Sequence, residues 1–404
     1  MTTIPMNIAQ TLAVAALTLT LGEFVKNRVA ILSRYFIPSP VIGGVLFSLL
    51  ALIGHQGGWF SFALDATMRD FLLLVFFTTI GFMASFELLK KGGLAVALFL
   101  VCAILLVLVQ NSVGVALAQA LGVSPLIGLA AGSIALTGGH GTAAAFGPLL
   151  EQAGAAGALP AAIAAATYGL VAGCVVGGPV GSLLIRRHGI AKPALHSGDA
   201  SPRQHVVQDE DEADAAPMNS DDAVLYAVVL LLISIGVGTL LVNWLKSLGI
   251  TLPAYLGPML VAALIRNLID WRDWHMPERK FEVIGNVSLA FFLTLALMSM
   301  KLWELAAVAG PLLVILVLQT AIMFAFTYFV TFRMMGSDYD AAVIAAGHCG
   351  FGMGATPNAM ANMEAFTRVN GPSFKAFFVV PLVGSLFIDF FNAVVITSFI
   401  GVLK

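Results

Sequence analysis

Blocks of about 20 consecutive apolar residues recur along the chain, and they constrain its fold more than any other feature. A helix of this length crosses the hydrocarbon core of a bilayer, which is about 30 Å thick. Only 10% of the 404 residues are charged, against about 25% in an ordinary soluble domain. Because the polar side chains that would cover a soluble protein are missing, the sequence predicts an all-α polytopic membrane protein.

Ten of these blocks are predicted to be membrane-spanning helices. They cover approximately residues 5–25, 37–55, 70–89, 92–119, 158–185, 223–245, 252–269, 282–300, 303–332 and 374–402. Two further apolar stretches, about 121–157 and about 337–372, are interrupted by clustered glycines, and neither contains an unbroken apolar run long enough to span. Each is expected to enter the membrane and return to the same side, as a re-entrant hairpin.

The distribution of Lys and Arg favours hairpins over extra spans, because basic residues concentrate on the cytoplasmic side. With ten spans, two hairpins and both chain termini outside, 16 of the 20 basic residues lie in the cytoplasm. The four that remain outside are Arg69, Lys246, Lys301 and Lys404. If both glycine-rich stretches crossed the membrane, the split would be 9 inside and 11 outside. We therefore expect the first hairpin to enter from outside and the second from the cytoplasm.

A hydrophilic segment divides the chain into two halves. Residues 189–221 contain the acidic run Asp209–Glu212 and three prolines, and they lack the apolar area needed to fold. They are predicted to be a disordered acidic cytoplasmic linker. The flanking domains are residues 1–188 and 222–404, each with five spans and a re-entrant hairpin between its fourth and fifth span.

The two halves match each other at an offset of 215 residues. Three segment pairs share this offset: Ile37-Pro38 with Leu252-Pro253, Phe76–Thr79 with Phe291–Thr294, and Ala130–Gly132 with Ala345–Gly347. Because each half has an odd number of spans, the second half lies upside down relative to the first. Inverted repeats of this kind are common in secondary transporters, where the halves can exchange conformations and so change which side is open.

The glycine-rich hairpins are the predicted binding site. Glycine permits sharp turns and close approach of a ligand, and free N–H and C=O groups at a break in a helix can hold an anion or Na⁺. The candidate substrate- and ion-binding residues in the hairpins are Thr137, Gly138, Gly139, His140, Gly141, Thr142, His348, Cys349, Gly350, Gly352, Gly354 and Thr356. The alternative is that these glycines only permit tight helix packing.

Histidine and cysteine do not form a recognisable metal site. His140 and His348 lie in the clusters and could relay protons or bind a metal, but neither has a second ligand at a metal-binding spacing. A hydrogen bond that fixes each hairpin is the favoured interpretation. Cys102, Cys174 and Cys349 lie in apolar stretches without paired spacing, so we expect small buried side chains and neither a disulfide nor a transition metal.

Asp389 is the sharpest single candidate, because a charged residue at the bilayer centre costs about 2.5–3.5 kcal/mol on insertion scales and is often functional. Asn392 is three residues further on and shares its helical face. The pair could offer oxygen ligands to Na⁺; the alternative is a structural hydrogen bond between helices. Gln110, Asn111 and Gln319 are weaker candidates, since single amides in membrane helices often only join helices.

These segments together resemble the bacterial sodium/glutamate symporter family. Ser133–Thr142 and Ala345–Gly352 look like the signature hairpins of that family, and Leu297–Leu305, Pro381–Gly384 and Phe387–Asp389 also resemble it. The resemblance runs through both halves and fails only in the acidic linker. It implies Na⁺-coupled uptake of L-glutamate across the inner membrane, a homodimer, and an elevator-type motion of a core that carries the hairpins past a fixed scaffold.

The resemblance implies no cofactor besides Na⁺ as coupling ion. The partners expected are L-glutamate, Na⁺ and membrane lipid, and the net charge of −2 gives no reason to expect nucleic acid. No basic residue lies in either glycine-rich core to meet the second carboxylate of glutamate. Backbone dipoles, hydroxyls or bound Na⁺ could balance it, or Arg69 or Lys301 could reach in from the outer side.

Other functions stay open on the residues alone. A related carrier of another small organic anion, such as a hydroxy-dicarboxylate, would use the same architecture with Na⁺ or protons as the driving ion. A channel would carry currents far beyond carrier turnover. An intramembrane enzyme would need a catalytic pair, and Asp389 is the only acidic residue deep in a predicted span.

Overall fold

The computed structural model describes residues 2–30, 32, 37–87, 93–191, 220–247, 254–272, 274, 276–305 and 308–403. The predicted linker lies outside these residues from 192 to 219. Seven described helices are long and apolar enough to cross a membrane, and a bent pair of helices near the C-terminus makes an eighth. The chain is therefore a helical multi-pass membrane protein, as its apolar blocks predict.

Five long helices form the first half. They are α1 (Ile8–Arg28), α3 (Ser39–Gln56), α4 (Thr67–Met83), α6 (Gly93–Ala120) and α9 (Ala158–His188). The first predicted hairpin region, between α6 and α9, contains α7 (Pro125–Leu129), the π-helical turn η1 (Ala130–Ile134) and α8 (Gly139–Gln152).

The second half repeats this order of elements. Its long helices are α11 (Ser220–Ser247), α12 (Leu256–Trp271), α13 (Glu278–Met298), α15 (Ala309–Phe326), and the pair α19 (Phe374–Leu386) and α20 (Ile388–Leu403). The short α14 (Leu302–Leu305) precedes α15, which continues through the π-helical turn η2 (Thr327–Thr331) into α16 (Phe332–Met334). The second hairpin region contains α17 (Tyr339–Met353) and α18 (Thr356–Asn370). Corresponding helices of the two halves end 215 positions apart. This holds for three pairs: α3 and α12, α4 and α13, and α9 and α20.

Three features differ from the sequence-based expectation. The last span, predicted as one helix over 374–402, is two helices that meet at a 46° bend, so Asp389 lies in the first turn of α20 and not in the middle of a continuous helix. Pro381 inside α19, six residues before Phe387, removes a backbone donor from that helix. The short strands β1 (Thr2–Pro5) and β2 (Phe60–Ala63) pair in parallel, although only helices were predicted. At 17 and 16 residues, α4 and α12 are shorter than the predicted spans.

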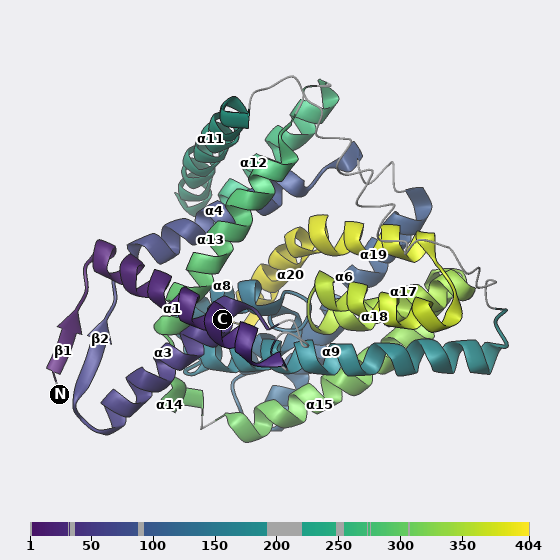
Figure 1. Cartoon of the computed structure of the whole chain (residues 1–404), viewed down its shortest axis with the longest axis horizontal. Helices are drawn as coiled ribbons and strands as arrows, with labels where there is room; N and C mark the ends of the chain where they lie inside the picture. The colour runs from purple at the N-terminus through teal and green to yellow at the C-terminus, as the bar shows by residue number, and fades with distance from the viewer. Residues whose placement is uncertain are drawn as a thin grey trace.

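The helices gather into two bundles (Figure 1). We call α1, α3, α4, α11, α12 and α13 the scaffold bundle, and α6–α9 with α15–α20 the core bundle. In the scaffold bundle α4 packs against both α12 and α13, around the buried side chains of Val75, Phe82 and Phe281. In the core bundle α9 packs against α8 and α17, and α20 packs against α6.

Close helix packing depends on particular glycines. A Cβ added at Gly81 of α4 would lie 2.2 Å from the carbonyl oxygen of Met259 in α12. A Cβ added at Gly169 of α9 would lie 2.1 Å from the carbonyl oxygen of Met353 in α17. Real Cβ atoms cannot approach a backbone oxygen so closely, so both contacts between the two halves of the chain require glycine.

Candidate functional site

Two interruptions in the hairpin helices lie against each other inside the core bundle. We call residues 135–138, between η1 and α8, the first break, and residues 354–355, between α17 and α18, the second break. A Cβ added at Gly139 would lie 3.1 Å from the carbonyl oxygen of Gly354, and the hydroxyl of Thr137 is 3.3 Å from the carbonyl oxygen of Gly352. The fold thus brings together two glycine clusters that are far apart in the sequence.

Glycine is needed where the backbone leaves helical geometry. Gly139, the first residue of α8, has a φ of +62°, a left-handed conformation that a residue with a Cβ adopts only at a cost. Gly132 within η1 has non-helical angles, with φ −90° and ψ −138°, so the chain already bends one turn before the first break. The predicted hairpin glycines therefore act in the backbone conformation as well as in packing.

Two helix N-termini face these breaks. In the described chain neither Gly138 before α8 nor Ala355 before α18 provides a side-chain cap. The first N–H groups of a helix have no partner within the helix, and its N-terminal end carries a partial positive charge. The start of α8 therefore presents backbone donors suited to a carboxylate, whereas at the start of α18 Pro357 has no N–H and the N–H of Asn358 bonds to the carbonyl oxygen of Ala355, which leaves the N–H of Thr356. Carbonyl groups at both breaks suit a hard cation.

A buried polar network holds the first break. Gln110 of α6 accepts a hydrogen bond from the hydroxyl of Thr137 at 2.7 Å, and its Nε2 donates to the carbonyl oxygen of Gly352 at 2.7 Å. The neighbouring Asn111 accepts from the backbone N–H of Ser133 at 2.8 Å. These two amides of one helix therefore fix the first break on both sides, and one of them also bonds the second hairpin.

Asn392 joins the same network from α20. Its Oδ1 accepts from the hydroxyl of Ser133 at 2.7 Å, and its Nδ2 donates to the carbonyl oxygen of Ser133 at 3.3 Å. The helix-joining interpretation of Asn392 is thus observed, and its side-chain oxygen is engaged by η1. Asp389 is half-buried one turn earlier, and no hydrogen bond or ion pair of its side chain is found within the described residues.

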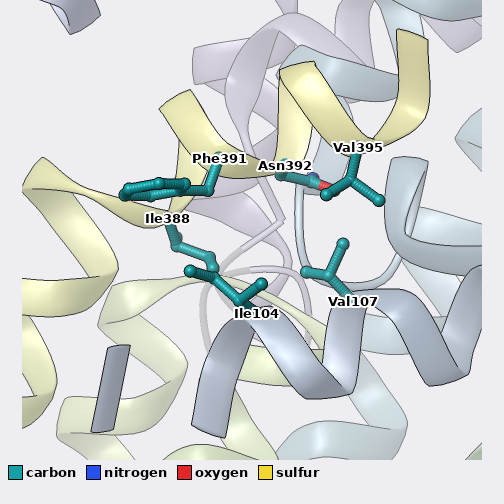
Figure 2. A pocket seen from close by; sticks show the side chains of 6 residues that line it. All are labelled: Ile104, Val107, Ile388, Phe391, Asn392 and Val395. Atoms are coloured by element: carbon teal, nitrogen blue, oxygen red, sulfur yellow. The ribbon is translucent and has the colours of Figure 1, made fainter. Parts of the chain in front are cut away.

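A shallow crevice lies beside Asn392, between α6 and α20 (Figure 2). Its other lining residues are the apolar Ile104, Val107, Ile388, Phe391 and Val395. Since Asn392 is the one polar side chain among them, this crevice lacks the several oxygen ligands that a sodium ion requires. Ser133, to which Asn392 is hydrogen-bonded, is not among the residues that line the crevice.

The two histidines and Cys349 bond to neighbouring helices. Nε2 of His140 lies 3.0 Å from the hydroxyl of Thr167 in α9, and Nδ1 of His348 lies 2.9 Å from the hydroxyl of Thr331 in η2. The sulfur of Cys349 lies 3.4 Å from the hydroxyl of Thr327, also in η2. The expectation that a hydrogen bond fixes each hairpin is confirmed at both histidines. Among the described residues no group of three His, Cys, Asp or Glu could hold a metal ion.

The remaining candidate residues lie near the breaks and make packing contacts with different helices. Thr142 is buried against Gly138, and a Cβ at Gly384 of α19 would lie 2.9 Å from the hydroxyl of Thr356. A Cβ at Gly350 would meet the backbone of α18 at 2.7 Å. Gly141 faces the scaffold bundle, since a Cβ there would lie 3.1 Å from Leu289 of α13. This glycine therefore marks the boundary between the two bundles.

Sequence reasoning missed two buried asparagines of α18. Nδ2 of Asn358 donates to the carbonyl oxygen of Leu170, and Nδ2 of Asn362 donates to that of Gly173, both at 2.9 Å. The available signal was their spacing of four residues, which places both amides on one helical face. Within the described chain, Oδ1 of Asn358 is buried without a partner.

The two basic residues that could reach in from the outer side, Arg69 and Lys301, are each paired with a carboxylate of the chain. Arg69 forms an ion pair with the adjacent Asp70 at 2.8 Å, and Lys301 forms one with Glu304 at 3.5 Å. Both cations already have a carboxylate partner. The backbone and hydroxyl groups of the breaks are thus the groups that the fold brings to the polar centre.

A multi-pass bundle in which interrupted helices meet at a buried polar centre has the architecture of a secondary transporter. The chain belongs to the sodium/glutamate symporter family, whose family model matches residues 4–372. The sodium/glutamate symporter of Escherichia coli (strain K12) is 42% identical to it over 392 residues, 96% of each chain. That of Haemophilus influenzae is 42% identical over 390 residues, 95% of each chain. This is a family of transporters, so the chain is not an enzyme.

Proposed function

We propose that the chain carries L-glutamate inward across the bacterial inner membrane together with Na⁺, and that the two breaks hold both solutes. Sodium-coupled glutamate symport is the function of the family to which the chain belongs. The observation that carries the site is the meeting of the breaks, where the hydroxyl of Thr137 lies 3.3 Å from the carbonyl oxygen of Gly352.

The chemistry at the breaks suits an amino-acid anion and a hard cation. The N–H groups at the start of α8, and that of Thr356 at the start of α18, can receive carboxylate oxygens. Carbonyl groups of the breaks and the hydroxyls of Thr137 and Thr356 can bind Na⁺. Asp389 is the nearby carboxylate without a described partner, and we assign it to Na⁺ binding. The predicted hairpin residues remain the candidates for the substrate.

We propose that the two halves are inverted repeats related by an approximate twofold axis through the breaks. Only residues near a twofold axis can contact their own counterparts. Thr137 and Gly352 are 215 positions apart, the offset of the repeat, and they are in contact. Gly139 and Gly354 have the same separation and also meet. These two contacts support the axis, and the odd number of predicted spans in each half supports the inversion.

Contacts between helix ends support the hairpin topology. The ring of His55 stacks on Trp303 with centroids 4.0 Å apart, and Nδ2 of Asn267 donates to the carbonyl oxygen of Ala84 at 2.8 Å. If each glycine-rich stretch crossed the membrane once, residues 158–336 would flip. Both contacts would then join opposite sides of the bilayer, which is impossible. With two re-entrant hairpins, each contact lies on one side.

The lengths of the hairpin helices agree with this topology. The longest of them, α17 and α18, have 15 residues each, and α8 has 14. At 1.5 Å per residue, such helices extend about 21–23 Å, somewhat less than the 17-residue α4 and the 16-residue α12 and well short of a core of about 30 Å. On the contacts of His55 with Trp303 and of Asn267 with Ala84, and on the distribution of Lys and Arg, we propose ten spans, with α4 and α12 among them, and termini in the periplasm.

We further propose an elevator-type motion and a homodimer. The breaks belong to the core bundle, so movement of that bundle past the scaffold bundle would carry the solutes. In α1 and α11 only 22% of the membrane-crossing window is buried, so the scaffold bundle offers the least covered helices to lipid or to a second copy. The homodimer rests on the family resemblance.

Uptake of radiolabelled L-glutamate into proteoliposomes tests the transport function. We expect uptake that requires an inward Na⁺ gradient, that is lost in Asp389→Asn, and that is kept in Ser398→Ala, an exposed position of the same helix. Uptake that ignores Na⁺ would remove the coupling. No glutamate uptake, with uptake of another small organic anion, would overturn the substrate assignment.

Cysteine labelling tests the topology. In a variant without the three natural cysteines, Trp59→Cys and Trp271→Cys place a thiol at positions that are 66% and 73% exposed. We expect an impermeant maleimide to label position 59 from the periplasm of intact spheroplasts, and position 271 only after permeabilisation. Labelling of position 271 in intact spheroplasts would contradict the hairpins.

A further inference from the structure

We infer that Gln110 is a positioning residue that holds the two breaks in register and thereby controls the affinity of the site for its solutes. Gln110 lies on α6, outside both hairpins, and is 1% exposed. Its side-chain amide bonds to the first break through Thr137 and to the second hairpin through Gly352. The inference rests on one part of the proposed function, namely that the breaks are the binding site.

The orientation of this amide follows from its partners. The carbonyl oxygen of Gly352 can only accept a hydrogen bond, so it must face the Nε2 group of Gln110. This leaves Oε1 of Gln110 to accept from the hydroxyl of Thr137. Both distances are 2.7 Å, and the amide group between them is rigid and planar. One side chain therefore sets the spacing between the two hairpins at the point where they meet.

The backbone that carries this amide is itself held. Nε2 of Gln319, from α15, donates to the backbone carbonyl oxygen of Gln110 at 2.7 Å. Gly114, one turn further along α6, allows the approach, because a Cβ there would lie 3.3 Å from Nε2 of Gln319. The position of Gln110 is thus fixed by α15, the helix that corresponds to α6 in the other half of the chain.

Loss of the amide would loosen the spacing of the breaks without removing a group that we assign to the solutes. A solute held between two segments depends on their spacing to within about 1 Å. Binding should therefore weaken, whereas the movement of the core bundle as a whole should change little. We expect Gln110→Ala to raise the half-saturation concentrations for glutamate and Na⁺ about tenfold, with a much smaller effect on the maximal rate.

A second variant separates positioning from a general packing defect. In Gln110→Glu an ionised carboxylate repels the carbonyl oxygen of Gly352, whereas a protonated carboxyl donates to Gly352 and accepts from Thr137, as the amide does. Its half-saturation concentration should therefore rise as the pH is raised, because the ionised form has no proton to donate to Gly352. The hydrogen-bond partners of Gln110 in the described chain are not ionisable.

The experiment measures initial uptake rates against glutamate and Na⁺ concentration for the wild type, Gln110→Ala, Gln110→Glu and Gln119→Ala. Gln119 is an exposed glutamine of the same helix and is the matched control. The expected result is a higher half-saturation concentration in Gln110→Ala, an added pH dependence only in Gln110→Glu, and no change in Gln119→Ala. Unchanged half-saturation in Gln110→Ala, or a Gln110→Glu pH profile like that of the wild type, would overturn the inference.

Thermal unfolding gives a readout that does not need transport. If Gln110 ties Thr137 to the second hairpin, the losses of stability in Gln110→Ala and Thr137→Val are not additive in the double variant. Additive losses would overturn the tie even if the wild type transported no glutamate. Absence of wild-type uptake would instead count against the proposed function alone.

Discussion

Both breaks directly precede a helix, α8 or α18, but different contacts hold them in place. The first is bonded by amide side chains that come from outside its hairpin, namely Gln110, Asn111 and Asn392. The second lies between tightly packed backbones, and a Cβ at Gly350 would lie 2.7 Å from the backbone nitrogen of Ala359. Side-chain hydrogen bonds are thus concentrated around the first break, whereas close backbone packing is more prominent around the second.

Added volume should affect the second break most, and this is the largest effect that we expect. Gly350→Val forces a branched side chain against the rigid backbone of α18, which should cost about 3 kcal/mol of stability. The measurement is the thermal unfolding temperature in detergent, together with uptake. Gly178→Ala on α9, where an added Cβ meets nothing within 4 Å, is the control and should be close to neutral. Equal losses in the two variants would remove the packing argument.

Loss of an amide should affect the first break more than the second. Asn392→Ala leaves the buried hydroxyl of Ser133 without its acceptor, which should cost about 2 kcal/mol. Asn358→Ala in α18 removes one hydrogen bond and should cost about 1 kcal/mol. A double-mutant cycle of Asn392→Ala with Ser133→Ala measures the coupling directly. If Asn358→Ala destabilised the protein more than Asn392→Ala, the difference between the breaks would be reversed.

The smallest expected effect distinguishes the two histidines. Thr331→Val leaves the fully buried ring of His348 without its partner and should cost about 1 kcal/mol. Thr167→Val should cost less, because Thr167 is only half-buried and water can replace its hydroxyl at His140. Thermal unfolding of both variants provides the comparison. A larger loss in Thr167→Val would show that the first hairpin depends on its histidine more than the second.

Much of the architecture could be predicted because short segments of the sequence determine it. The apolar blocks predict the long helices, and the glycine clusters predict where both hairpins are interrupted. The bend between α19 and α20 was missed, since Phe387 continues an apolar run and Pro381 alone does not require a break. The strands β1 and β2 were missed because four residues are too few to show a period of two.

The hydrogen-bond partners of the polar residues could not be predicted from the local sequence. Gln110 and Asn111 were treated as weak candidates because a lone amide in an apolar helix has the same pattern whether it joins helices or holds a site. The partner of Gln110 lies 242 positions away, at Gly352, and no local pattern indicates it. Asp389 was favoured because its charge alone is unusual in a membrane, and its role stays a prediction.

The sequence by itself determined the class of protein and the positions of its helix breaks. Each of these depends on the local preference of a segment for lipid, for helix or for a turn. Only the tertiary structure decided that the two breaks meet, that Asn392 bonds to Ser133, and that Gln110 bonds to both hairpins. Hydrogen bonds act over about 3 Å, so their partners are set by how the helices pack and not by distance along the chain.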